Sequence, residues 1–135
     1  MTGEASWPLQ QAVYARLSQD SALTDMVTGI FDSPPLKPVF PFLMLDGGNS
    51  RDWSGVGFSG QEHRLLLHVW SDAPGQAQVK AVMDRIYALL HDRTLNLTAH
   101  RLVNMRFEFA QLLHEREPPL RHAVMRFRVI THALI

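Results

Sequence analysis

The chain has 135 residues, of which 46% are hydrophobic, and its 13 basic residues balance 13 acidic ones. This length predicts one domain over residues 1–135, with enough apolar side chains for a single core. Neutral net charge gives no overall attraction to nucleic acid or membranes. The absence of cysteine excludes disulfides and thiolate metal sites, and no apolar run is long enough to span a bilayer.

Two helical segments are predicted near the N-terminus. We expect residues 1–6 to form a flexible tail that lacks the pattern of a secretory signal. Apolar residues at helical spacing predict a helix over residues 8–19, with Ser6 as its cap. Asp20 or Ser21 can cap a second short helical turn.

A proline-rich connector follows between two short apolar segments. Residues 30–31 and 40–45 have the composition of short strands. Residues 32–41 contain four of the eight prolines, which exclude a helix there. We therefore expect an extended connector across the surface.

Residues 47–60 contain five glycines and three serines, which predicts a flexible loop or arm. Three large apolar side chains in this loop are costly to leave in water. They either fold back on their own core or order against a neighbouring subunit, and we favour the second interpretation. The predicted subunit-interface residues are Arg51, Trp53, Val56 and Phe58.

The C-terminal half predicts the main sheet and its covering helix. Residues 61–71 alternate as a long strand, and residues 76–91 carry an apolar stripe at helical spacing. Residues 102–113 and 123–129 alternate on either side of a proline-containing loop at 114–120, which predicts a hairpin. The side chains expected to face the core are Val103, Met105, Phe107 and Phe109 on the first of these strands and Ala123, Met125, Phe127 and Val129 on the second.

These elements together predict an α+β fold. We expect a mainly antiparallel sheet of four to five strands, with helices packed on one face. The opposite face would carry Arg64, Arg106, Arg126 and Arg128, with Glu108 reducing their charge. This face is either solvated or meets nucleic acid or an acidic partner.

Catalytic chemistry has little support in the sequence. None of the seven histidines belongs to a HExxH or His-x-His pattern, and His63 and His68 are predicted on opposite faces of one strand. Residues 55–60 match G-x-G-x-x-G, but they precede a strand rather than a helix. We predict no catalytic residue, no cofactor and no metal site, so the chain is not expected to be an enzyme.

A series of segments covers most of the chain from residue 9 to residue 133: LQQAVYARLSQDSALTDMV, PFLMLD, SRDWSG, EHRLLLHVWS, QVKAVMDRIYALLHD, RLVNMRFEFAQ and RHAVMRFRVITHA. In this order they resemble phage tail terminator proteins, also called tail completion or tail-to-head joining proteins. These proteins occur in phages, prophages and phage-like gene transfer particles.

The resemblance implies a structural virion protein without catalytic residues. Such a protein would form a homo-hexameric ring at the head-proximal end of the tail, assembled in the bacterial host cytoplasm. The ring would bind the tail tube protein and end the tail tube, and it would also bind the head-tail connector (stopper) protein. It would leave a passage for DNA, and its contacts with that DNA would be transient and without sequence preference. No membrane is implied.

Two other functions remain open from the residues alone. One is a small ligand- or peptide-binding module without catalysis, in which the glycine-rich loop acts as a lid. The other, which we favour least, is a small hydrolase or metal enzyme that uses the histidines. A concentration-dependent oligomer would favour the ring, and a tight monomer would favour the binding module.

Overall fold

The computed structural model describes residues 4–116 and 119–134, which form one six-stranded sheet and three helices. The helices are α1 (Ser6–Ser18), α2 (Ser21–Thr24) and α3 (Ala77–Leu90). The strands are β1 (Ile30–Phe31), β2 (Phe42–Asp52), β3 (Gly60–Ser71), β4 (Asn96–Leu97), β5 (His100–Arg116) and β6 (Pro119–Ala133).

The sheet has the order β1-β2-β3-β6-β5-β4, and only the β1–β2 pair is parallel. The predicted α+β class and mainly antiparallel pairing are confirmed. The predicted number of four to five strands is wrong, because the sequence did not indicate the two-residue strand β4, which pairs at one edge of the sheet. β4 is too short to produce a recognisable alternation in the sequence.

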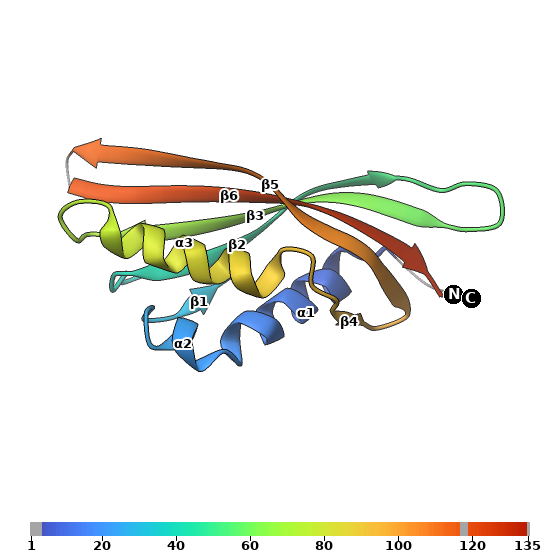
Figure 1. The fold of residues 1–135 in the computed structure, drawn as a ribbon, viewed down its shortest axis with the longest axis horizontal. Coiled ribbons are helices and arrows are strands. Elements are labelled where there is room, and N and C mark those ends of the chain that lie inside the picture. Colours follow the sequence, from blue (N-terminus) through green and yellow to red (C-terminus); the bar gives the residue numbers. More distant parts are fainter. Residues whose placement is uncertain (1–3, 117–118, 135) are drawn as a thin grey trace.

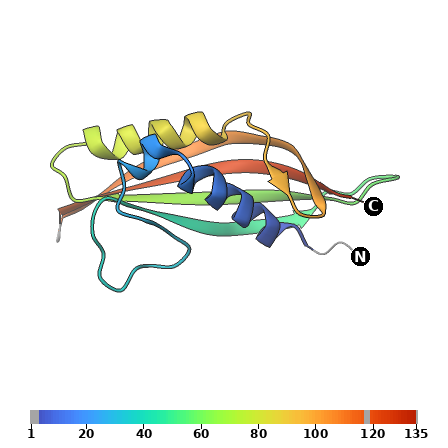
Figure 2. The same cartoon turned by 90° about the horizontal axis from the view of Figure 1, so that it is seen from below.

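The helices α1 and α3 cover one face of the sheet, which we call the inner face (Figures 1 and 2). The strand β3 shows why the sequence folds this way: Leu65, Leu67 and Val69 are buried, whereas the residues between them are partly exposed. Helix α3 buries Val79, Val82, Ile86, Leu89 and Leu90 in the same core. Each fully buried aliphatic side chain stabilises this packing by about 1.5–3 kcal/mol.

The N-terminal helix begins earlier than the sequence predicts. Ser6 is its first residue rather than its cap, and the Oγ of Ser6 donates a hydrogen bond to Glu4 over 2.6 Å. Glu4 also accepts hydrogen bonds from Ser50 and Gln61. Residues 4–6 of the predicted flexible tail therefore contact the sheet, while residues 1–3 lie outside the described residues.

Helix α2 is capped by Asp20, which was one of the two caps that the sequence predicted. Its carboxylate accepts a hydrogen bond from the backbone of Leu23 over 2.9 Å. Arg85 of α3 donates two further bonds to the same carboxylate, at 2.8 and 2.6 Å. Hydrogen bonds from Arg85 lower the pKa of Asp20 to about 2. One side chain thus both caps α2 and ties it to α3.

Strand β5 differs from its predicted alternation because its pairing with β6 shifts register twice. The shifts fall between Leu102 and Asn104 and between Phe107 and Phe109. Each extra residue turns the following side chains to the opposite face. Val103 and Phe109 were therefore wrongly predicted in the core, and they are 40% and 43% exposed. Met105 is fully buried as predicted and Phe107 is partly buried, whereas Leu102, Ala110 and Leu112 are the further inward residues of β5.

The predicted inward residues of the last strand are all confirmed, since Ala123, Met125, Phe127 and Val129 are buried. The loop predicted at residues 114–120 is shorter than expected. β5 continues to Arg116, and β6 starts at Pro119, where a missing backbone N–H is tolerated at a strand end. The two remaining residues of that loop, 117–118, lie outside the described residues.

Residues 47–60, which were predicted to be a flexible loop or arm, lie in a long hairpin, and much of the segment is strand. β2 continues to Asp52, and β3 begins at Gly60, so only residues 53–59 connect the strands. The pairing of β2 with β3 shifts register between Asp46 and Asn49, and Gly48 adopts a φ of +60° at this point. A Cβ at Gly48 would lie 1.8 Å from the carbonyl oxygen of Arg64. The glycine is required here by both the backbone conformation and the close approach.

Candidate functional site

The predicted arginine face exists on the side of the sheet opposite the helices, which we call the outer face. Arg64 of β3 pairs in register with Arg128 of β6, and Arg128 pairs with Arg106 of β5. Arg126 lies two residues before Arg128 and points to the same face. Alternation along three neighbouring strands therefore places all four predicted arginines on one surface.

Carboxylates neutralise much of this surface. Glu62 lies 3.0 Å from Arg51, 2.9 Å from Arg64 and 2.7 Å from Arg128. Its 8% exposure makes it the most buried carboxylate of the cluster. Burial disfavours the charged form of Glu62, but the hydrogen bond from Arg128 and the nearby guanidinium of Arg64 outweigh it, so the pKa of Glu62 is lowered.

A second carboxylate continues the network. Glu108 contacts Arg64 at 3.1 Å and Arg126 at 2.8 Å, while Arg106 pairs with Asp92 at 2.9 Å. The sequence identified the moderating role of Glu108 but missed that of Glu62. The i, i+2 spacing of Glu62 and Arg64 on one strand could have indicated it. The outer face is a mixed network in which Glu62 and Glu108 are shared among Arg51, Arg64, Arg126 and Arg128, while Arg106 pairs with Asp92.

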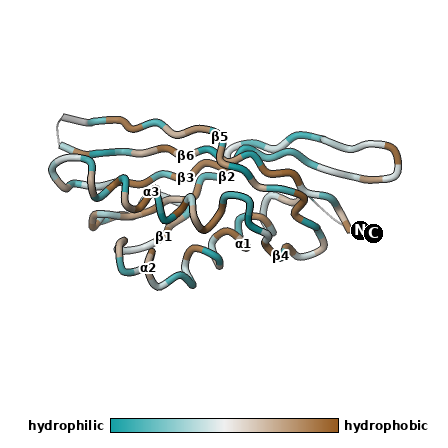
Figure 3. Tube along the Cα trace, viewed as in Figure 1, coloured by the Kyte–Doolittle hydropathy of each residue, from teal (hydrophilic) through white to brown (hydrophobic). Residues whose placement is uncertain are grey.

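The hairpin β2–β3 carries the four residues predicted at a subunit interface. Figure 1 shows its loop extending beyond the ends of the other strands, and Figure 3 shows a hydrophobic stretch at its tip. Trp53 and Phe58 pack near each other and against His132, with ring centroids 6.1 Å and 4.6 Å from that imidazole. Val56 is fully exposed.

These contacts divide the apolar residues of the hairpin into two groups. Trp53 and Phe58 fold back on their own chain, which matches the interpretation that we did not favour, although Trp53 is still 43% exposed. Val56 is free to meet another molecule. Arg51 is mostly exposed but is held by Glu62.

A stack of aromatic rings occupies the other end of the outer face. The rings of Trp70 and His122 are parallel at 3.7 Å, and Nδ1 of His68 lies 2.8 Å from Nε2 of His122. Asp46 lies 3.5 Å from His68. Burial, followed by the charge of His68, lowers the pKa of His122 to about 4. His122 is therefore neutral at physiological pH.

His63 lies on the inner face, as the alternation predicts. Its ring nitrogen is 2.9 Å from the hydroxyl of Thr131, and burial lowers the pKa of His63. His63 and His68 are thus on opposite sides of the sheet. Within residues 4–116 and 119–134, no cluster of three or more potential ligands could hold a metal ion.

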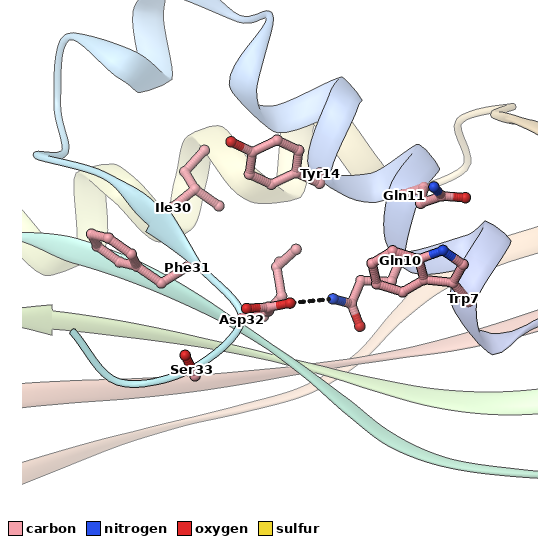
Figure 4. Close-up of a pocket in the computed structure, with 9 residues that line it drawn as sticks. Trp7, Gln10, Gln11, Tyr14, Ile30, Phe31, Asp32 and Ser33 are labelled. Atoms are coloured by element: carbon pink, nitrogen blue, oxygen red, sulfur yellow. Dashed lines mark hydrogen bonds between the residues drawn. The ribbon is translucent and has the colours of Figure 1, made fainter. Parts of the chain in front are cut away.

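A groove of about 560 Å³ lies between α1 and β1. Figure 4 shows Trp7, Gln10 and Tyr14 from α1 facing Ile30, Phe31 and Asp32, with Gln10 donating a hydrogen bond to Asp32 over 3.2 Å. Trp7 and Tyr14 are 59% and 48% exposed. No feature of the sequence indicated this groove, because the groove forms only when α1 packs beside the edge strand β1.

None of the helices in the described part of the chain is long and apolar enough to cross a membrane.

The chain is similar to known tail proteins over nearly its whole length. A family model described as "Tail completion protein gp17" matches residues 11–132. The tail completion protein gp17 of Bacillus phage SPP1 is 21% identical over 124 residues, which are 92% of both chains.

Two solved structures share the fold. A chain in the virion of a native gene transfer agent particle superposes with a TM-score of 0.89 and 27% identity, covering 98% of this chain and all of that one. The gp17 protein of bacteriophage SPP1 superposes with a TM-score of 0.66 and 21% identity, covering 93% of this chain and 89% of that one.

Proposed function

Because the chain belongs to the tail completion protein gp17 family, we propose that it forms a ring that ends the tail tube and joins it to the head connector. The chain is a structural tail protein of phage-type particles, and the resemblance to phage tail and gene transfer particle proteins is confirmed. The single observation that carries the ring proposal is the full-length superposition on a virion chain.

The proposed ring is a hexamer built from head-to-tail contacts. In such a ring one patch of each copy meets a different patch of the next copy, and rotation closes the chain of contacts. The β2–β3 hairpin supports this arrangement, because its loop extends from the body and presents Val56 to solvent. We place Arg51, Trp53, Val56 and Phe58 at this contact, with Val56 as the residue that inserts.

The outer face is proposed to line the DNA passage. Arg64, Arg106, Arg126 and Arg128 lie together there, and six copies would repeat their charge around a lumen. Pairing with Glu62 and Glu108 lowers the potential of this surface. Weak attraction suits a passage through which DNA moves, since many tight phosphate contacts would hold it in place.

The ring is proposed to occupy the head-proximal end of the tail, after assembly in the bacterial cytoplasm. Its partners would be the tail tube protein and the connector protein. A structural tail family supports a protein without catalysis.

Electron microscopy of the purified protein, with light scattering over a range of concentrations, tests this proposal. We expect closed six-fold rings and a mass that rises to six copies. Particles assembled without the protein should contain filled heads and separate tails. A monomer at every concentration, with normal joining of heads and tails in its absence, would reject the ring and favour the ligand- or peptide-binding module.

A further inference from the structure

The proline-rich connector, residues 32–41, presents apolar side chains on a constrained backbone. Leu36 is completely exposed and Val39 is 64% exposed. The backbone N–H of Thr28 donates to the carbonyl of Pro41 over 2.8 Å, and the hydroxyl of Thr28 donates to the carbonyl of Val39. Since prolines also limit the backbone, little conformational freedom remains to be lost on binding.

An apolar groove of about 280 Å³ lies between α3 and β5. Met83 and Tyr87 line it from the helix, and Phe107 and Ala110 line it from the strand. Tyr87 is 40% exposed, so part of this lining is in contact with water. Lys80 and Asp84 also line the groove, from exposed positions on α3.

The connector and this groove belong to opposite sides of the molecule. The connector joins β1 to β2 at one edge of the sheet, whereas β5 lies near the other edge. Figure 2 shows the connector extending away from the side on which β5 lies. The connector of a given copy is therefore directed away from its own groove, and it is available to another copy.

We propose that the connector of one copy docks in the α3–β5 groove of the next copy, an inference that rests on the proposed ring. Leu36 and Val39 match the apolar lining. Lys37 between them is opposite in charge to Asp84, which lines the groove one helical turn after Lys80. None of the salt bridges within residues 4–116 and 119–134 includes Lys37 or Asp84. A projection at one edge and a groove at the other give a head-to-tail contact that can close into a ring.

The α1–β1 groove is a poorer receptor for the connector. Asp32 and Ser33, which begin the connector, also line that groove. Because the connector and this groove are adjacent, two copies could bind each other there reciprocally, and a reciprocal contact closes with two copies. The α3–β5 groove avoids this restriction.

Charge reversal tests the contact with little risk to folding, because Lys37 and Asp84 are both exposed. We expect Lys37→Glu alone and Asp84→Lys alone each to raise the concentration for half-assembly at least about tenfold, measured by light scattering. Both changes in one chain should restore assembly to within about threefold of the original. Asp72→Lys, at an exposed turn, is the matched control and should have little effect.

Cysteine mapping tests the same contact by proximity, because the natural chain contains no cysteine. A Leu36→Cys variant is mixed with a Lys80→Cys variant and treated with a mild oxidant, which removes the two thiol hydrogens as the disulfide forms. We expect a cross-linked pair on a denaturing gel. Mixing Leu36→Cys with Gln11→Cys, at the α1–β1 groove, should give no such product.

The outcomes separate this contact from the ring itself. If the unmodified protein remains a monomer, both the ring and the contact are rejected. If it forms rings that the charge reversals do not weaken, or if the double reversal fails to restore them, only the contact is rejected. Cross-linking to residue 11 instead of residue 80 would also overturn it and would place the connector at the α1–β1 groove.

Discussion

Replacing Phe127 and Phe109 separately with alanine tests the register shift in β5. Phe127 is completely buried, and its ring packs edge-on against Phe107 at 5.7 Å. Phe109 follows the second shift and is 43% exposed. Regular alternation would put Phe109 on the same face as Phe107, so the two substitutions distinguish the observed pairing from the simple pattern.

The expected costs differ severalfold. Phe127→Ala removes a buried ring and leaves a cavity, which costs about 3–5 kcal/mol of unfolding free energy. For a chain of this size that corresponds to a melting temperature lower by about 10–20 °C. Phe109→Ala loses mainly the contact with the guanidinium of Arg126, which lies 5.1 Å from the ring centroid. An exposed contact of this kind contributes about 0.5–1 kcal/mol.

Urea unfolding of the two variants and the original protein, at a concentration that keeps them monomeric, gives both free energies. The reasoning predicts a large loss for Phe127→Ala and a small one for Phe109→Ala. Equal losses of about 3 kcal/mol or more would show that Phe109 is in the core and that the second register shift is absent. A negligible loss for Phe127→Ala would reject the assignment of the inner face itself.

Four further predictions concern the outer face and the hairpin. Glu62→Gln keeps the shape of the side chain but removes the charge that Arg128 contacts, so unfolding in urea should show a loss of about 1–3 kcal/mol, and an unchanged midpoint would contradict the network. Since the pKa of His122 falls from 6.5 to about 4 in the folded state, the unfolded state binds the extra proton first. Stability should therefore be unaffected above pH 6.5 and should fall as the pH decreases toward 4, and His122→Gln should reduce that dependence; an equal slope in both proteins would refute it. Val56→Glu should leave the melting temperature unchanged, because Val56 is fully exposed, yet it should prevent ring formation in electron micrographs. Intact rings would exclude the hairpin tip from the contact. Trp53→Ser should weaken both folding and assembly.

Much of the candidate surface was predictable, because alternation depends only on local backbone geometry. The arginines of β3 and β6 were placed correctly on one face, since neither strand shifts register within that pairing. The position of Glu62 among three guanidiniums was not predicted. Its contacts with Arg51 and Arg128 depend on which strands are neighbours and on their relative register, and residue spacing within one strand does not specify either.

The sequence by itself determined the elements whose pattern is continuous: the stripe of α3, the alternation of β3 and β6, and the proline-rich connector. It also carried the family resemblance, which was spread over nearly the whole chain. Tertiary structure decided the features that require a partner strand. The register shifts in β5 turned Phe109 outward, the pairing of β2 extended a glycine-rich segment into a hairpin, and the two-residue edge strand β4 was added. Each of these depends on hydrogen bonds to a distant segment, and such bonds override the preferences that a short stretch of sequence expresses.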